Sequence, residues 1–422
     1  MLRAFINAFK IPDLRKKILF TLLIIAVYRL GSFLPLPNVD VQALAGTAGQ
    51  NQQGFFSFIN LFSGGALTRL AVFALGIMPY ITSSIIMQLL TVVIPKLEQW
   101  QKQGEIGQKR ITQWTRYMTV ALALIQSTGL LFLFNTQFAG SIKSFTAPRI
   151  AFMVLILTAG TAMIMWLGEL ITQRGIGNGM SMLIFTSVIS ELPSQGASIW
   201  QTGRVEFGII VAIGLAIIVA VVFMEQGQRR IPVQYAKRVV GRRMTSGGST
   251  YIPLKVNQAG VIPIIFASSV LYFPTLLRSV VQWQWFQNLV DNHLLNQGSA
   301  VYIVVYGLLV VFFAYFYTAI SFNPNDTADN IRKYGGFIPG IRPGKPTADH
   351  LNHILSRITL PGALFLATIA LIPSIALIIL GIDPSLFPFG GTSVLIAVGV
   401  ALETMKQLES QLTMRHYEGF IK

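Results

Sequence analysis

The stretch FFSFINLFSGGALTRLAVFALGIMPYITSSIIMQLL, residues 55–90, decides the fold of this 422-residue chain. It joins a short apolar piece, Phe55–Phe62, to a longer one, Leu70–Leu90, through Ser63-Gly64-Gly65, which we call the hinge. A helix of about 20 residues, rising about 1.5 Å per residue, crosses a hydrocarbon core of about 30 Å. The short piece cannot cross. We therefore expect the longer piece to span a membrane and the short one to dip into it or lie on it.

The composition places the whole chain among polytopic membrane proteins. It is 53% hydrophobic and only 11% charged, whereas an ordinary soluble domain is roughly 25% charged. The absence of cysteine excludes disulfides, thiolate catalysis and cysteine-ligated metals. Residues 1–17 are polar and basic and lead directly into a long apolar segment, so no cleavable signal peptide is visible.

Apolar segments recur along the chain and predict an all-α fold of ten transmembrane helices. The fifth is the weakest, because it ends at Glu191-Leu192-Pro193. The ten segments are 18–36, 70–94, 117–134, 150–170, 180–200, 207–224, 259–281, 300–320, 358–381 and 387–405.

The distribution of basic residues supports ten spans and predicts their orientation. With ten spans, both termini and the loops 95–116, 171–179, 225–258 and 321–357 share one side, which carries 26 of the 32 lysines and arginines. The opposite side carries 5, and Arg29 lies within the first span. Positive charge marks the cytoplasmic side of a membrane protein. Both termini are therefore expected in the cytoplasm.

Two spans contain the same short motif. The second reads GIMPYITSS from Gly76, and the seventh reads GVIPIIFAS from Gly260. Because each is second in a group of five spans, the match predicts two inverted, pseudo-symmetric halves, residues 1–205 and 206–422. Glycine and proline at matched positions mark interrupted helices that line a cavity. We therefore expect a central cavity between the second and seventh spans.

Isoleucines beside these prolines, Ile77, Ile81 and Ile265, have two interpretations. They pack in the core or face lipid, as most isoleucines in spans do. Alternatively they form an apolar constriction that holds back water and ions by dewetting. Spacing alone leaves both open.

Three other classes of function compete with a passive conduit. A secondary transporter built on inverted repeats is the first, but no ionisable residue sits at a predicted midplane: Arg29 can snorkel outward and Glu169 ends a span near the cytoplasm. A membrane prenyltransferase is suggested by Asn325-Asp326-x-x-Asp329, which a helix cap explains equally well. A zinc hydrolase is disfavoured because His350 and His353 lack the HExxH glutamate. No catalytic, cofactor or metal residue is predicted.

The two long cytoplasmic loops suggest partners. Loop 225–258 carries seven basic residues and one acid, Glu225, which is typical of topology determinants and of attraction to anionic lipids. A partner with an acidic or phosphate-rich surface, such as a ribosome, is the alternative. In loop 321–357 the segment Pro339–Gly344 predicts a structured turn that presents Arg342.

Four segments carry a resemblance to a known family. They are AVFALGIMPYITSSIIMQLL (71–90), WLGELITQRGIGNGMSMLI (166–184), GQRR (227–230) and NPNDTADNIRKYGGFIPGIRPG (323–344). Together with the rest of the chain they resemble the SecY family, the large subunits of bacterial protein-translocation channels. The long loop 321–357 is similar to the bacterial branch.

The resemblance implies a clamshell of two five-helix halves around an hourglass pore, together with specific site residues. The pore ring would be Ile77, Ile81, Ile184, Ile265 and Ile396. The plug that closes the outer funnel would be residues 55–67, including Phe55, Phe56, Phe58, Ile59, Asn60, Leu61, Phe62, Ser63, Gly64 and Gly65. The polar positions of the lateral gate would be Thr82, Gln126 and Asn257. The motor and ribosome contacts would be Arg242, Arg243 and Arg342.

The resemblance also implies a function and partners. The chain would conduct unfolded secretory polypeptides across the bacterial plasma membrane and insert membrane proteins sideways, without catalysis of its own. SecE and SecG would complete a heterotrimer, and the SecA motor or a ribosome, contacting it partly through ribosomal RNA, would supply energy. Signal peptides, nascent polypeptides and anionic lipids would be further partners.

Overall fold

A computed structural model provides the structure of the chain. It describes residues 9–40, 60, 62–137, 142, 145–235, 238–240, 243–245, 249–278, 283–295, 298–381 and 390–418. Residues 55–59 and 61 of the predicted plug therefore lie outside the described residues, as do Arg242 and residues 382–389, which cover the predicted last loop and the start of the tenth span.

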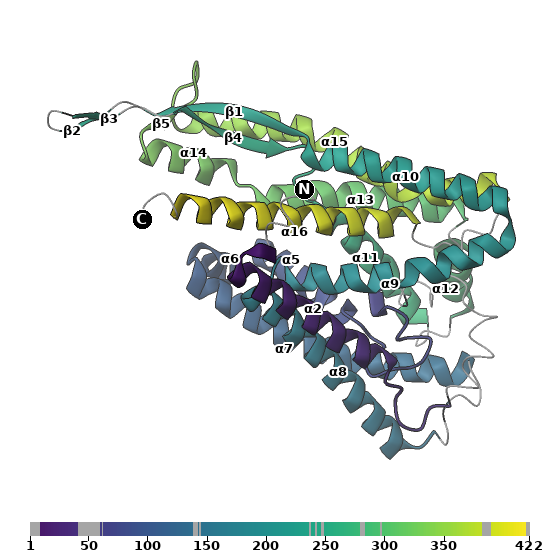
Figure 1. The fold of residues 1–422 in the computed structure, drawn as a ribbon. Helices are drawn as coiled ribbons and strands as arrows, with labels where there is room; N and C mark the ends of the chain where they lie inside the picture. The colour runs from purple at the N-terminus through teal and green to yellow at the C-terminus, as the bar shows by residue number, and fades with distance from the viewer. Residues whose placement is uncertain are drawn as a thin grey trace.

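Each of the ten predicted spans contains a helix (Figure 1). These helices are α2 (Pro12–Phe33), α5 (Met78–Val93), α7 (Glu105–Gln137), α8 (Ala147–Arg174), α9 (Gly179–Thr202), α10 (Arg204–Gln226), α11 (Ile262–Arg278), α13 (Ala300–Ser321), α15 (Lys345–Ile379) and α16 (Gly390–Glu418). Shorter elements are α6 (Pro95–Lys102), α12 (Gln284–Leu289), the π-helical turn η1 (Val290–Leu295) and α14 (Pro324–Lys333). Among the described residues, five helices are long and apolar enough to cross a membrane alone, or six if the bent α5–α6 pair counts as one.

The second span is not the continuous helix that its apolar length predicts. Residues 64–77 form successive turns, with the single bridge residue Ala71, and α5 begins only at Met78. After Val93 the chain bends by 100° into α6. Sixteen helical residues span about 24 Å, less than the hydrocarbon core. The buried turns before α5 cover the remaining depth, because non-helical backbone is tolerated in a membrane only when protein surrounds it.

The two long loops, for which no strand was predicted, contain a small sheet (Figure 1). Strands β1 (Gln228–Tyr235) and β4 (Ser249–Lys255) pair antiparallel, and β5 (Gly336–Phe337) from the other long loop adds to the free edge of β1. The hairpin continues outward as β2 (Arg238–Val240) and β3 (Arg243–Thr245). A small apolar cluster containing Ile231, Leu254 and Leu351 attaches the sheet to α14 and the start of α15. The two basic loops are thus one structural unit.

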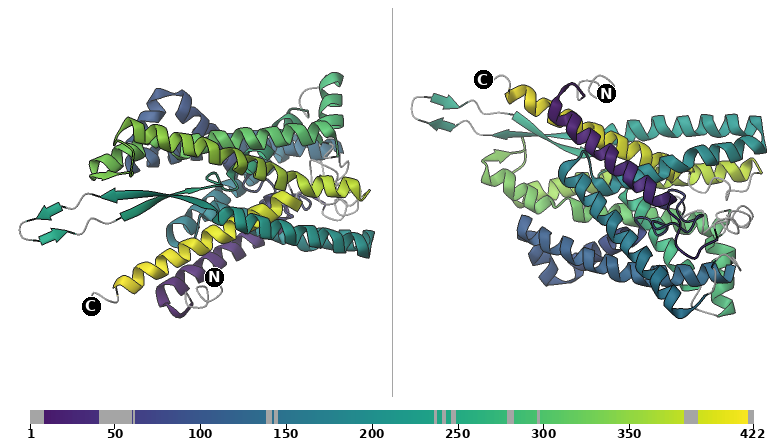
Figure 2. Two further views of the ribbon diagram at one scale, coloured as in Figure 1. Left: turned by 90° about the horizontal axis from the view of Figure 1, so that it is seen from above. Right: turned by 60° about the horizontal axis from the view of Figure 1, so that its bottom comes forward.

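The two described ends of the chain lie together. Lys17 in α2 donates to the side chain of Gln411 in α16, and Leu14 and Leu408 belong to one buried cluster. Figures 1 and 2 show this pair at the same end of the helix bundle as the sheet, and we call it the basic end. The predicted shared side of the termini and long loops agrees with this arrangement.

Packing divides the ten helices into two groups. Helices α2, α5, α7, α8 and α9 contact one another, as do α10, α11, α13, α15 and α16. The groups meet where α5 packs on α11 and where α9 packs on α10 and α16. A single buried apolar cluster runs through both. Helix α9 packs on helices of both groups, so the division at residue 205 and the inverted symmetry of the two halves both remain predictions.

Candidate functional site

The repeated motif builds the same helix start twice. Gly76 and Gly260 have φ angles of 55° and 61°, in the left-handed region that favours glycine. Each lies two residues before the helix that follows, α5 or α11. Pro79 and Pro263 are the second residues of those helices, where their missing N–H groups leave no helical bond unmade. The motif therefore marks a helix start in both spans, preceded in the second span by turns rather than by helix.

The five isoleucines predicted as a pore ring are all buried. Ile77 precedes α5, Ile81 lies in its first turn and Ile265 lies in the first turns of α11, while the other two come from α9 and α16. Each is at most 7% exposed, and all belong to the same central apolar cluster. Four of them lie in α5, α9, α11 and α16, and α5 packs on α11 while α9 packs on α16. Their shared role as a ring stays a prediction.

The described part of the plug segment is firmly packed. Phe62 and Ser63 are buried, and Gly64 and Gly65 of the hinge have φ angles of 61° and 85°. The hydroxyl of Ser63 accepts from the backbone N–H of Leu67, and the N–H of Gly65 donates to the carbonyl of Asn60. The hinge therefore turns the chain sharply against the helices around it.

The three predicted gate residues have different surroundings. Thr82 donates its hydroxyl to the carbonyl of Met78 within α5, and Gln126 lies buried on the neighbouring helix α7 with no hydrogen-bond partner for its Oε1. Asn257 instead donates to the carboxylate of Glu225 and to the carbonyl of Gly260. No hydrogen bond joins the three to one another. Thr82 and Gln126 share one pair of packed helices, whereas Asn257 belongs to another site.

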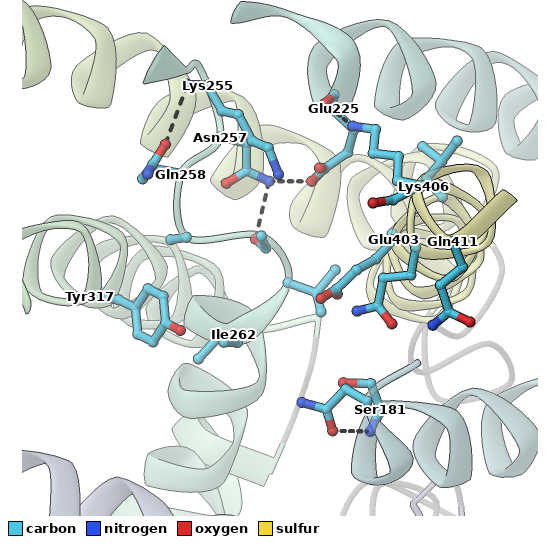
Figure 3. Close-up of a pocket in the computed structure, with 18 of the residues that line it drawn as sticks. Ser181, Glu225, Lys255, Asn257, Gln258, Ile262, Tyr317, Glu403, Lys406 and Gln411 are labelled. Carbon is cyan, nitrogen blue, oxygen red and sulfur yellow. Dashed lines mark hydrogen bonds between the residues drawn. The ribbon is translucent and has the colours of Figure 1, made fainter. Parts of the chain in front are cut away.

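That other site is a pocket of about 660 Å³ between α9, α11 and α16 near the basic end (Figure 3). Figure 3 shows Glu225 and Asn257 on one side, Glu403 and Gln411 of α16 on another, and Tyr317 of α13 opposite. Lys406 donates to the backbone carbonyl of Glu225, which ties α16 to the end of α10. No sequence motif predicted this pocket. The one residue that could have indicated it is Glu225, the only acidic residue in loop 225–258.

A second polar pair escaped the sequence analysis. Arg116 of α7 donates from Nε and Nη2 to the two carboxylate oxygens of Glu169 in α8, at 2.7 and 2.6 Å. The Glu169 side chain is 19% exposed, so this bidentate pair is partly shielded from water. The Arg116–Glu169 pair holds the N-terminal half of α7 against α8.

Two of the three predicted partner-binding arginines, Arg243 and Arg342, lie at the basic end. Arg342 is exposed between β5 and α15, after a turn in which the N–H of Ile341 donates to the carbonyl of Ile338 and Gly340 has a φ of 83°. Proline followed by a glycine of positive φ is the pattern of a type II turn. Thr347 donates to the Arg342 carbonyl and steadies the tip. Arg243 begins β3, and Arg242 lies outside the described residues.

The Asp-rich motif of loop 321–357 is a helix start. Asn323 is the N-cap of α14: its side-chain oxygen accepts from the N–H of Asn325, and its amide donates to Asp326. Asp326 lies in the first turn, where a negative charge stabilises a helix. Among the described residues no cluster of histidine and acidic side chains could hold a metal ion. The capping explanation accounts for the motif.

Comparison with known proteins decides the family. The family model described as SecY matches residues 71–405, the greater part of the chain. The chain belongs to the SecY family. Relatives named protein translocase subunit SecY are 55% identical in Streptomyces scabiei over 442 residues and 52% identical in Mycobacterium bovis over 445, and both alignments cover all of each chain.

Solved structures show the same fold. The chain superposes on a protein-conducting channel with a TM-score of 0.64 at 19% identity, covering 96% of each chain. It also superposes on Sec61 from a canine ribosome–channel complex, with a TM-score of 0.60 at 17% identity and the same coverage. The expected all-helical polytopic fold with ten spans is thereby confirmed. Like its SecY relatives, the chain is a membrane-embedded channel for protein translocation.

Proposed function

We propose that the five isoleucines form the constriction through which this SecY-family channel conducts unfolded polypeptides. The observation that carries the proposal is their common burial in the one apolar cluster that runs through both groups of helices. An apolar ring forms few specific bonds with a passing chain and so tolerates any sequence. At rest it holds back water and ions by dewetting.

Sideways release of apolar segments would take place between the helix groups. Helices α5 and α7 on one side and α11 and α13 on the other would flank the opening, with Thr82 and Gln126 on its first wall. A signal peptide or a membrane segment of a nascent polypeptide would leave through this opening because lipid buries its apolar area. Asn257, the third predicted gate position, would act at the pocket end of α11.

The basic end would face the cytoplasm of a bacterial cell, with both termini on that side of the plasma membrane. The support is the concentration of lysine and arginine in the segments that lie there. Anionic lipid headgroups would surround this end, since basic residues near the surface attract them.

We expect no catalysis by the chain itself, and partners would supply the driving force. SecE and SecG would complete the membrane complex. SecA or a ribosome would dock on the sheet and the Arg342 turn, with Arg242 and Arg243 at the far hairpin contacting SecA or ribosomal RNA. One similar structure is of Sec61 in a ribosome–channel complex, which supports the ribosome as a partner.

Transport into proteoliposomes with SecA and ATP tests the docking surface. Arg342→Glu reverses the charge at an exposed tip that no buried contact needs, so we expect insertion and thermal stability to be unchanged and SecA-driven transport to be lost. Arg357→Glu, on an exposed face of α15 at the same end, is the matched control and should transport normally. Normal transport by Arg342→Glu would refute this surface.

A further inference from the structure

Arg29 is a charged residue within a membrane-spanning helix, and such residues are costly and usually functional. The sequence allowed it to snorkel toward the outer surface. Instead its Nη1 donates to the backbone carbonyl of Gly64 at 2.7 Å and to the hydroxyl of Ser190 in α9 at 2.9 Å. One guanidinium therefore connects α2, the hinge and α9.

The hinge is shaped around this contact. A Cβ on Gly64 would lie 2.9 Å from Nη1 of Arg29 and 3.1 Å from the Cα of Ser187, and one on Gly65 would lie 2.7 Å from Oε1 of Glu191. Both glycines also have positive φ angles. A side chain at either position would push the hinge away from α2 and α9, so the two glycines permit the close approach that the hydrogen bonds need.

Helix α2 provides a rigid base for the arginine. The hydroxyl of Tyr28 lies 2.6 Å from that of Ser187, and because Ser187 donates to the carbonyl of Leu183, Tyr28 is the donor. The Tyr28 ring also stacks on Phe73, with centroids 5.8 Å apart. The Arg29 guanidinium lies 5.2 Å from the centroid of the Phe33 ring. The position of Arg29 is thus fixed from several directions.

We propose that Arg29 is a latch that holds the plug hinge against α9 in the resting channel, so that opening requires its hydrogen bonds to Gly64 and Ser190 to be released. The carboxyl group of Glu191 lies beside the hinge, because its Oε1 is the atom nearest to a Cβ built on Gly65. It offers the guanidinium a partner once Gly64 has moved. The proposal rests on the proposed function and on the plug role that the family resemblance implies for residues 55–67.

Resting ion conductance of proteoliposomes, made with the purified channel and its co-purifying subunits, tests the latch. Arg29→Gln removes the charge and the paired donation, and hydrogen bonds to charged groups are strong enough that the open fraction should rise about 10-fold to 100-fold. Ser190→Ala removes one of the two acceptors and should raise it by a smaller factor. Arg204→Gln removes an exposed arginine that also lies over an aromatic ring but does not touch the hinge, and it should change nothing.

Hydrogen exchange in residues 62–70 provides a second measurement, and it should accelerate in Arg29→Gln and Ser190→Ala but not in Arg204→Gln. If Arg29→Gln fails to insert, Ser190→Ala carries the test alone. Unchanged conductance and exchange in Arg29→Gln and Ser190→Ala would overturn the latch, as would equal leakage from Arg204→Gln.

A channel in which the five ring isoleucines are changed to glycine distinguishes a failure of the latch from a failure of the proposed pore. If it leaks while the latch variants stay sealed, only the latch fails; if it stays sealed, the proposed pore fails.

Discussion

The two copies of the Gly-x-x-Pro motif have the same backbone and opposite surroundings. A Cβ on Gly76 would lie 2.7 Å from the carbonyl oxygen of Phe62, just before the hinge, whereas a Cβ on Gly260 would meet nothing within 4 Å. Gly260 lines the pocket beside Asn257 and also accepts a hydrogen bond from it. The plug segment packs against Gly76 of the first copy, whereas Gly260 of the second copy lines a polar pocket.

This difference shows which structural features come from the motif itself and which come from the residues packed around it. The left-handed glycine and the following proline set where each helix begins, and they do so equally in both groups of helices. The surrounding chain differs: the segment before the hinge packs on the α5 start, whereas the α11 start borders the polar pocket. Substitutions at matched positions can therefore test each contribution alone.

The largest contrast is expected between Gly76→Ala and Gly260→Ala. Both place alanine at a positive φ, which costs about 1–2 kcal/mol. Only at Gly76 does the new methyl group also collide with backbone, which adds about 1–3 kcal/mol. Denaturant unfolding in detergent should therefore show a loss of about 2–5 kcal/mol for Gly76→Ala and about 1–2 kcal/mol for Gly260→Ala. Equal losses would mean that the hinge does not press on the α5 start.

A second contrast lies between the buried amides of the two groups. Asn257→Ala deprives Glu225 and the Gly260 carbonyl of a donor and should cost about 1–3 kcal/mol. Gln126→Met replaces a side chain whose buried Oε1 has no partner, so stability should change by less than about 1 kcal/mol. Thermal unfolding measures the loss of stability in both variants. Gln258→Met, at a neighbouring pocket residue, is measured beside them for comparison. A larger loss for Gln126→Met would indicate a partner that forms only in the membrane.

The smallest effects are expected at the prolines, and there the two copies should behave alike. Pro79→Ala and Pro263→Ala leave each helix start in place but raise the conformational entropy of the unfolded chain. Each should therefore lower the free energy of unfolding by about 0.5–1 kcal/mol. The same unfolding measurement serves as the check. A difference well above 1 kcal/mol between the two would show that the helix starts are not equivalent.

Much of the fold follows from local sequence. Apolar length placed the ten spans, and Gly76 with Pro79 marked the interruption before α5, although length alone suggested a continuous helix. The sheet was missed because β1 exposes most of its residues and buries only Ile231 and Val233, a pattern too short to separate from loop. Its stability comes from α14 and α15, about a hundred residues later.

The apolar and polar parts of the candidate site differ in how far the sequence predicts them. Spacing left core packing and a constriction both open for Ile77, Ile81 and Ile265, and only the family resemblance added Ile184 and Ile396 and made the five a ring. Polar partners depend on contacts between distant segments. Arg29 meets Gly64 and Ser190, and Asn257 meets Glu225, only after the helices have packed. No local pattern encodes such pairs.

The central claim is that the buried isoleucines seal and line the pore, and ion conductance tests it most directly. Ile77, Ile81, Ile184, Ile265 and Ile396 are changed together to glycine, and the channel is measured at rest in planar bilayers. The control has the four exposed isoleucines and leucines of α10 and α13, Ile209, Leu215, Ile218 and Leu308, changed to valine. We predict that the glycine channel passes ions steadily while the control stays closed. A glycine channel that inserts, folds and conducts no more than the unmodified channel would contradict the account.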